Sequence, residues 1–152
     1  MTARRVSLAF MVLASLGALC IGTAASAVEL QGLKGYQLDT IYGRYAPGGD
    51  CKRQPQVVAD ATGLTFEVGG KSEKVTNPEQ AMDFNGPDYQ GSDIWIFPFR
   101  LKDGYSILMT FNPNSKKGAL EIAPQDEGYP GGPKLSPRNQ ALVSGSPYAR
   151  CK

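Results

Sequence analysis

The fold is decided by residues 64–75, which read LTFEVGGKSEKV. Leu64, Phe66 and Val68 alternate with polar residues, so their side chains share one face of a β-strand. The two glycines that follow supply the positive-φ positions of a tight hairpin turn. The stretch therefore predicts an antiparallel hairpin, one face of which is directed toward a core.

Short apolar runs separated by Gly, Pro, Asn and Asp continue on both sides of this hairpin, which is typical of an antiparallel β protein. The most strongly β-forming run is 94–97, and Pro98 after it marks a strand end, a bulge or a sheet edge. Residues 77–93 are polar with little periodicity, and we expect a loop there. Further strands are expected at 41–46, 57–59, 105–111 and 120–122.

A short helix is predicted near the C-terminus. Ser136 is a suitable N-cap, Pro137 stands at the first helical position, and Gly145 offers a C-terminal stop.

The N-terminus has the three parts of a secretory signal peptide, residues 1–27. Arg4 and Arg5 precede an apolar run, and Ala25-Ser26-Ala27 offers the small residues of a cleavage site. A retained membrane anchor is the alternative, and it needs about 20 apolar residues without such a site. We expect cleavage, a periplasmic or secreted location, and residues 28–152 as a single β-rich domain that does not span a membrane.

The cysteines predict a disulfide. Cys20 leaves with the signal, and an even pair, Cys51 and Cys151, remains in an oxidising compartment. Closing a loop of about 100 residues stabilises a domain by roughly 4–5 kcal/mol, so the pair is structural and not catalytic. The predicted fold class is all-β: a small antiparallel barrel or sandwich of about six to eight strands with a short C-terminal helix, closed by one disulfide.

Composition excludes several functions. The chain has 16 basic and 14 acidic residues, and two of the basic ones, Arg4 and Arg5, belong to the signal peptide. Residues 28–152 therefore have no net charge and lack the positive field that nucleic-acid binding requires. The chain contains no histidine, and it has no nucleotide-binding, nucleophile-elbow or zinc-protease motif. We therefore expect a protein that is not an enzyme and has no cofactor and no metal.

Two clusters of oxygen-bearing side chains each have a functional and a structural interpretation. Glu67 and Glu73 flank the hairpin turn and would suit a carboxylate-pair hydrolase, although solvated strand-face charge explains them more simply. Oxygen-bearing side chains also crowd the segment that follows, where Asx turns compete with a calcium site as the explanation. These side chains are Asp83, Asn85, Asp88 and Asp93.

Aromatic residues supply candidate binding groups. Four aromatic residues near the centre of the chain could form a platform that binds sugar or peptide. Packing in the core and rim of a small barrel is the simpler interpretation. Tyr129, in a loop rich in Gly and Pro, is less easily buried and is a candidate partner-binding residue. The four central aromatics are Tyr89, Trp95, Phe97 and Tyr105.

The segment Ser144-Gly145-Ser146-Pro147-Tyr148 ends three residues before Cys151. Small hydroxylated residues around a glycine, tethered by a disulfide, form a narrow loop that can enter an enzyme cleft. The segment and the cysteine layout resemble the periplasmic C-type lysozyme inhibitors, small antiparallel β-barrels that insert such a loop into the lysozyme active site.

The resemblance implies that Ser144, Ser146 and Tyr148 insert into a partner, which would be lysozyme or another secreted or periplasmic enzyme. The family carries this motif in mid-chain, whereas here it adjoins the last cysteine, and the family's second motif has no counterpart. The alternative is a helix C-cap at Gly145 followed by a tail that Pro147 fixes.

Two functions follow from these patterns. The first is an exported, non-enzymatic binding protein that inhibits a cell-wall hydrolase or another secreted enzyme. The second is an envelope-associated domain that binds glycan or lipid through aromatic loops. The oligomeric state is open.

Overall fold

The structure, a computed structural model, describes residues 33, 35, 37–84, 92–102, 104–125, 130 and 132–152. These residues form a mostly antiparallel β fold with one short α-helix and one disulfide, as predicted. The signal peptide assigned to 1–27 lies outside them. No helix in the described part of the chain has the length and apolar character needed to cross a membrane.

The strand number was predicted wrongly, because the described residues contain eleven strands and not six to eight. The additional strands are short or stand in the segment expected to be a loop. The strands are β1 (Gly43–Pro47), β2 (Gln56–Asp60), β3 (Gly63–Val68), β4 (Lys71–Val75), β5 (Glu79–Phe84), β6 (Ser92–Phe97), β7 (Arg100–Leu101), β8 (Gly104–Tyr105), β9 (Ile107–Phe111), β10 (Ala119–Pro124) and β11 (Tyr148–Arg150). The helical elements are η1 (Leu38–Ile41), η2 (Pro113–Ser115) and α1 (Pro137–Ser144).

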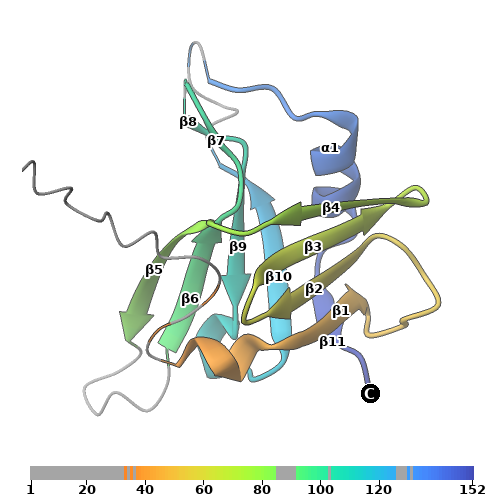
Figure 1. The fold of residues 1–152 in the computed structure, drawn as a ribbon, viewed down its shortest axis with the longest axis vertical. Helices are drawn as coiled ribbons and strands as arrows, with labels where there is room; N and C mark the ends of the chain where they lie inside the picture. The colour runs from red at the N-terminus through yellow and green to blue at the C-terminus, as the bar shows by residue number, and fades with distance from the viewer. Residues whose placement is uncertain are drawn as a thin grey trace, which may run out of the picture.

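Nine of these strands form one sheet in the order β4-β3-β2-β1-β11-β10-β9-β6-β5, while β7 and β8 pair separately. The sheet curls into a half-barrel whose two edge strands, β4 and β5, follow each other in the chain (Figure 1). The strand nearest the C-terminus, β11, lies in the middle of the sheet between β1 and β10.

The β3–β4 hairpin has the predicted register. Val68 pairs with Lys71 around Gly69 and Gly70, whose φ angles of 58° and 75° only glycine adopts without strain. Leu64 and Phe66 of β3 are buried, as their alternation predicted, whereas the side chains at the start of β4 are exposed.

The helix begins and ends where the sequence predicted. The Ser136 side chain accepts a hydrogen bond from the Asn139 N–H at 3.2 Å, and Gly145 caps the other end. The buried Asn139 side chain also donates to the Ser106 Oγ at 2.8 Å. Because α1 contacts both β3 and β10, it covers the core between the two halves of the curled sheet, where Leu142 is fully buried.

The core fills the curl of the sheet. Its tyrosines are hydrogen-bonded internally, since the Tyr45 hydroxyl donates to the Ile41 carbonyl at 2.8 Å. The buried apolar members are Leu33, Leu38, Ile41, Tyr45, Val57, Ala59, Leu64, Phe66, Ile94, Ile96, Ile107, Met109, Phe111, Leu120, Ile122, Leu142 and Tyr148.

The predicted disulfide joins Cys51 to Cys151, whose Cα atoms lie 5.9 Å apart. The Cys151 N–H also donates to the Arg44 carbonyl at 2.8 Å, so a backbone hydrogen bond fixes the same position. The disulfide therefore anchors the end of β11 beside β1.

Candidate functional site

The segment that resembles an inhibitor loop is built into the fold. Tyr148 is only 2% exposed, and its hydroxyl donates to the Leu142 carbonyl at 2.7 Å. The Ser146 Oγ accepts a hydrogen bond from the Ile122 N–H at 3.0 Å. Ser144 is exposed at the end of α1. Burial raises the pKa of Tyr148 above its ordinary value, as expected for a phenol enclosed by the core.

The alternative interpretation of this segment, a helix stop at Gly145, is confirmed. The Gly145 N–H donates to the Ala141 carbonyl at 3.0 Å. A Cβ at this position would lie 2.6 Å from the Tyr148 hydroxyl and 2.9 Å from Cγ of Pro55, so close packing requires the glycine. Insertion into an enzyme stays a prediction that depends mainly on Ser144. Tyr129 lies outside the described residues.

The two hairpin carboxylates do not form a pair. Glu73 stands opposite Phe66 and Glu67 opposite Ser72, so the two glutamates point to opposite faces of the hairpin. Arg44 binds Glu67 at 2.8 Å, and Arg138 binds Glu73. The geometry of a carboxylate-pair hydrolase is therefore missing at this hairpin.

The acidic residues weighed as calcium ligands are only partly described. Asp83 and Asp93 stand opposite each other on β5 and β6, while Asn85 and Asp88 lie outside the described residues. Within the described ranges, no group of three or more His, Cys, Asp and Glu side chains is placed to hold a metal ion.

The aromatic residues of β6 lie on the outer face of the nine-stranded sheet, and Tyr105 of β8 packs against one of them. Ile94 and Ile96 point into the core, so Trp95 and Phe97 point outward, and Trp95 is 36% exposed. The Phe97 ring centroid lies 4.7 Å from that of Tyr105. The simpler expectation was packing in the core and rim, and Trp95 is not part of the core. We call Trp95, Phe97 and Tyr105 the aromatic face. Tyr89 lies outside the described residues.

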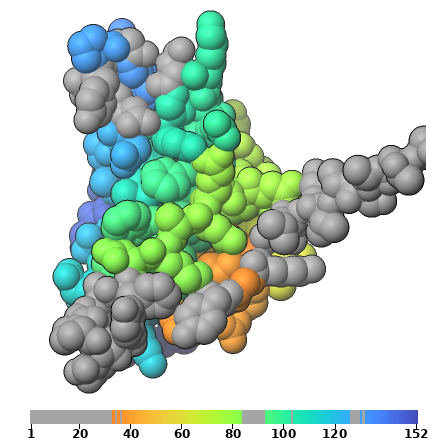
Figure 2. Space-filling model, turned by 90° about the vertical axis from the view of Figure 1, so that its left-hand side faces the viewer, coloured from red at the N-terminus to blue at the C-terminus, as the bar shows by residue number. Residues whose placement is uncertain are grey.

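The neighbours of Trp95 leave its ring accessible. Ala81 on β5 and Thr110 on β9 stand directly beside it in the sheet, and both side chains are small. The Tyr105 hydroxyl donates to the Glu79 carboxylate, which also binds Arg100 at 2.5 Å. Figure 2 shows this side of the molecule, where β5 and β6 lie in green.

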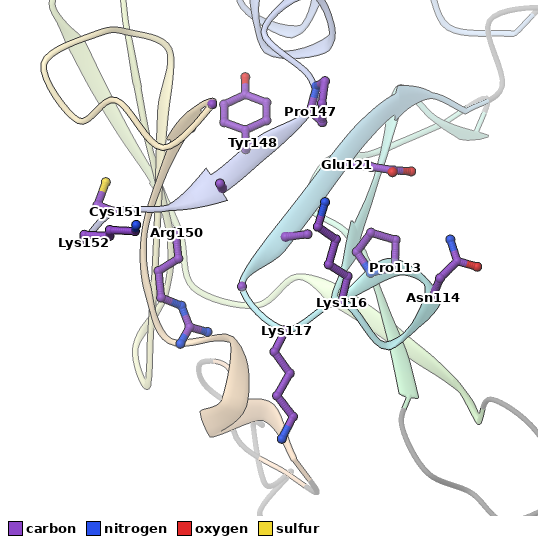
Figure 3. A pocket seen from close by; sticks show the side chains of 14 residues that line it. Pro113, Asn114, Lys116, Lys117, Glu121, Pro147, Tyr148, Arg150, Cys151 and Lys152 are labelled. Carbon is purple, nitrogen blue, oxygen red and sulfur yellow. The ribbon is translucent and has the colours of Figure 1, made fainter.

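A second feature is an open groove of about 920 Å³ at the outer faces of β10 and β11. The η2 turn forms one wall with Lys116 and Lys117, and Lys152 lies across from them beyond β11 (Figure 3). Glu121 of β10 also lines the groove. This cationic site could not be predicted from the sequence, because pairing of β10 with β11 brings together residues that are far apart in the chain.

The Arg150 side chain, although part of this lining, serves the fold. Its guanidinium donates to the Tyr45 hydroxyl at 3.0 Å and to the Thr40 carbonyl. Burial raises the pKa of Tyr45, and the adjacent guanidinium partly offsets that effect. Arg150 is therefore already occupied, whereas the three lysines have no ion-pair partner among the described residues.

No protein-family model, curated protein or solved structure matches this chain. The function must therefore be inferred from the aromatic face and the groove themselves.

Proposed function

We propose that this chain is an exported, non-enzymatic binding protein and that its aromatic face binds the sugar rings of a glycan. The observation that carries the proposal is the exposed indole of Trp95 on the outer face of a rigid sheet. A large exposed aromatic side chain costs solvation free energy, and it is typical of a surface that contacts a ligand.

The chemistry of the aromatic face suits a sugar. One face of a pyranose ring presents C–H groups, which pack on the face of an indole, while its hydroxyls project from the edges. Thr110 and Glu121 continue the same row on β9 and β10 and offer hydrogen-bonding oxygens to those hydroxyls. Strands lie about 4.8 Å apart, which is close to the length of one sugar unit.

The aromatic rings beside Trp95 are held in place by contacts within the fold. Phe97 packs against Tyr105, whose hydroxyl is bound by Glu79. Hydrogen bonds and ring packing thus limit the freedom of the platform before a ligand arrives, so less entropy is lost on binding.

The test uses Trp95 as its own reporter, because it is the only tryptophan in the chain. Chitin and cellulose oligosaccharides and solubilised peptidoglycan are titrated into the protein, and at least one is expected to change the tryptophan emission. Calorimetry with Trp95→Ala is then expected to show an affinity loss of about tenfold or more.

The matched control is Leu101→Ala, because Leu101 is also a large exposed apolar side chain, at 47%, but is not one of the three residues of the aromatic face. We expect its affinity to equal that of the unmodified protein. If no saccharide changes the emission and phospholipid vesicles do, the ligand is a lipid and the proposal is wrong. It is equally wrong if Trp95→Ala binds saccharide as tightly as the unmodified protein.

A further inference from the structure

We infer that the glycan is polyanionic, a sugar chain whose carboxylate or phosphate groups lie in the lysine-lined groove while a neighbouring ring stacks on Trp95. This inference rests on the proposed function and specifies its ligand. It combines two features that the sequence separates, the aromatic face and the groove.

The groove and the aromatic face are continuous on one side of the sheet. Trp95 pairs with Thr110, and Thr110 pairs with Glu121, so the three side chains form one row on the outer face. Glu121 is also part of the groove lining. Two strand spacings, about 10 Å, therefore separate Trp95 from the near wall of the groove. A ligand a few sugar units long reaches both.

Basic side chains outnumber acidic ones in the groove lining. Lys116, Lys117 and Lys152 are exposed, and none has an ion-pair partner among the described residues. Three arginines elsewhere on the surface, by contrast, each bind a glutamate. Glu121 is the single acidic side chain in the lining. The groove therefore concentrates positive potential on a protein that is neutral after position 27.

The lysines lie on two sides of the groove. In Figure 3, Lys116 lies over β10, Lys117 extends from the same turn in the opposite direction, and Lys152 lies on the far side of β11. Ala119 and Ala149, which pair directly, line the groove with small side chains and leave room along the two strands. An extended chain fits this shape better than a compact ion.

Lysine also suits a repeating polyanion. Its ammonium group is a flexible point charge, so it follows a string of acidic groups without demanding the fixed geometry that arginine imposes. Salt screens the attraction between exposed charges. Added salt therefore separates the contribution of the lysines and the ligand's acidic groups from that of ring stacking. Sugar stacking on Trp95 should be insensitive to salt, and the groove's contribution should be sensitive to it.

The experiment compares matched ligands that differ only in charge. Polygalacturonate and its fully methyl-esterified form provide the carboxylate pair, and phosphomannan and mannan provide the phosphate pair. The emission of Trp95 reports binding to each. At low salt, at least one acidic polymer is expected to bind with an affinity at least tenfold higher than that of its neutral partner. Whether the carboxylate pair or the phosphate pair shows the larger difference identifies the acidic group. In 1 M salt, where the screening length is about 3 Å, the difference should disappear.

The variant carries Lys116→Gln, Lys117→Gln and Lys152→Gln together. It is expected to lose the tenfold preference for the acidic polymer and to bind the neutral polymer as before. A control with the same charge change replaces Lys71, Lys102 and Lys134, which are exposed outside the groove, and should keep the preference.

Two failures are distinguishable. If acidic and neutral polymers change the Trp95 emission with equal affinity, or if the two triple variants behave alike, the anionic assignment is wrong while sugar stacking stands. If no polymer, charged or neutral, changes the emission, the proposed function is wrong, and this inference is wrong with it.

Discussion

Replacing both Cys51 and Cys151 by alanine should lower the free energy of unfolding by about 4–5 kcal/mol. The two residues are separated by 100 positions, and the loop that they close contains β2 to β11. In the chain-entropy model, opening a loop of this length restores conformational freedom to the unfolded chain worth about 4.7 kcal/mol at 25 °C. A small domain has about 5–15 kcal/mol in total, so the variant should be marginally stable.

The native structure itself should persist in this variant. The Cys151 N–H still donates to the Arg44 carbonyl, and β11 still pairs with β1 and β10. The loss therefore arises in the unfolded state, which becomes less compact and exposes more surface. Urea unfolding should show a lower midpoint and a steeper dependence of the free energy on denaturant.

The assay is urea unfolding, followed by Trp95 emission and circular dichroism, of the oxidised protein, the reduced protein and the double variant. The reduced protein and the variant should agree, which separates loss of the bond from loss of the sulfur atoms. A decrease of less than about 1 kcal/mol with an unchanged denaturant slope would refute the entropic reasoning.

Four further predictions concern packing, capping, pH and the inhibitor hypothesis. Leu142→Ala should cost about 2–5 kcal/mol in urea unfolding because the side chain is fully buried beneath α1, and a loss under about 1 kcal/mol would contradict this placement. Ser136→Ala should cost about 1 kcal/mol, since it removes the acceptor of the first helical turn; an unchanged midpoint would count against the cap. Above about pH 10 the urea midpoint should fall, because burial raises the pKa of Tyr148 and the unfolded chain therefore loses its phenolic proton first; Tyr148→Phe should make the fall shallower. Titration with this protein should leave lysozyme activity unchanged, because the Ser146 hydroxyl is hydrogen-bonded to β10, and inhibition abolished by a substitution of the exposed Ser144, Ser144→Arg, would instead support insertion.

The elements that could be predicted from sequence carry strong local signals. The hairpin at 64–75 combines strict alternation with Gly69-Gly70, and α1 combines Ser136 with Pro137, so local preference and tertiary structure agree. Strand β5 was missed because it is an edge strand in a polar stretch. Of its inward-facing residues, Met82 packs against the core, while Gln80 is exposed.

Strand β11 was missed for a different reason. It contains only Tyr148–Arg150, too few residues to show a period, and pairing with strands on both sides stabilises it. The same context explains the hydroxyl groups of the 144–148 segment, which suggested a protruding loop. Ser146 and Tyr148 use their hydroxyls to bind backbone groups of the fold.

The candidate site was predicted in part. Alternation along 94–97 places Trp95 on the face opposite to Ile94 and Ile96, so an outward indole could be predicted from the pattern, although packing in the core and rim was the simpler expectation. No pattern in the sequence indicates the lysine-lined groove. Lys116 and Lys152 meet only because β10 and β11 are neighbours in the sheet.

The central position of β11 sets the order in which the molecule can mature. Because a chain is synthesised from its N-terminus, β1 to β4 and β5 to β10 are made before Tyr148–Arg150, and each half of the sheet then has an unpaired edge where β11 later pairs. In the sheet that the structure describes, the two halves are hydrogen-bonded to each other only through this late strand. The sheet and the disulfide are therefore completed at the same stage, because Cys151 directly follows β11.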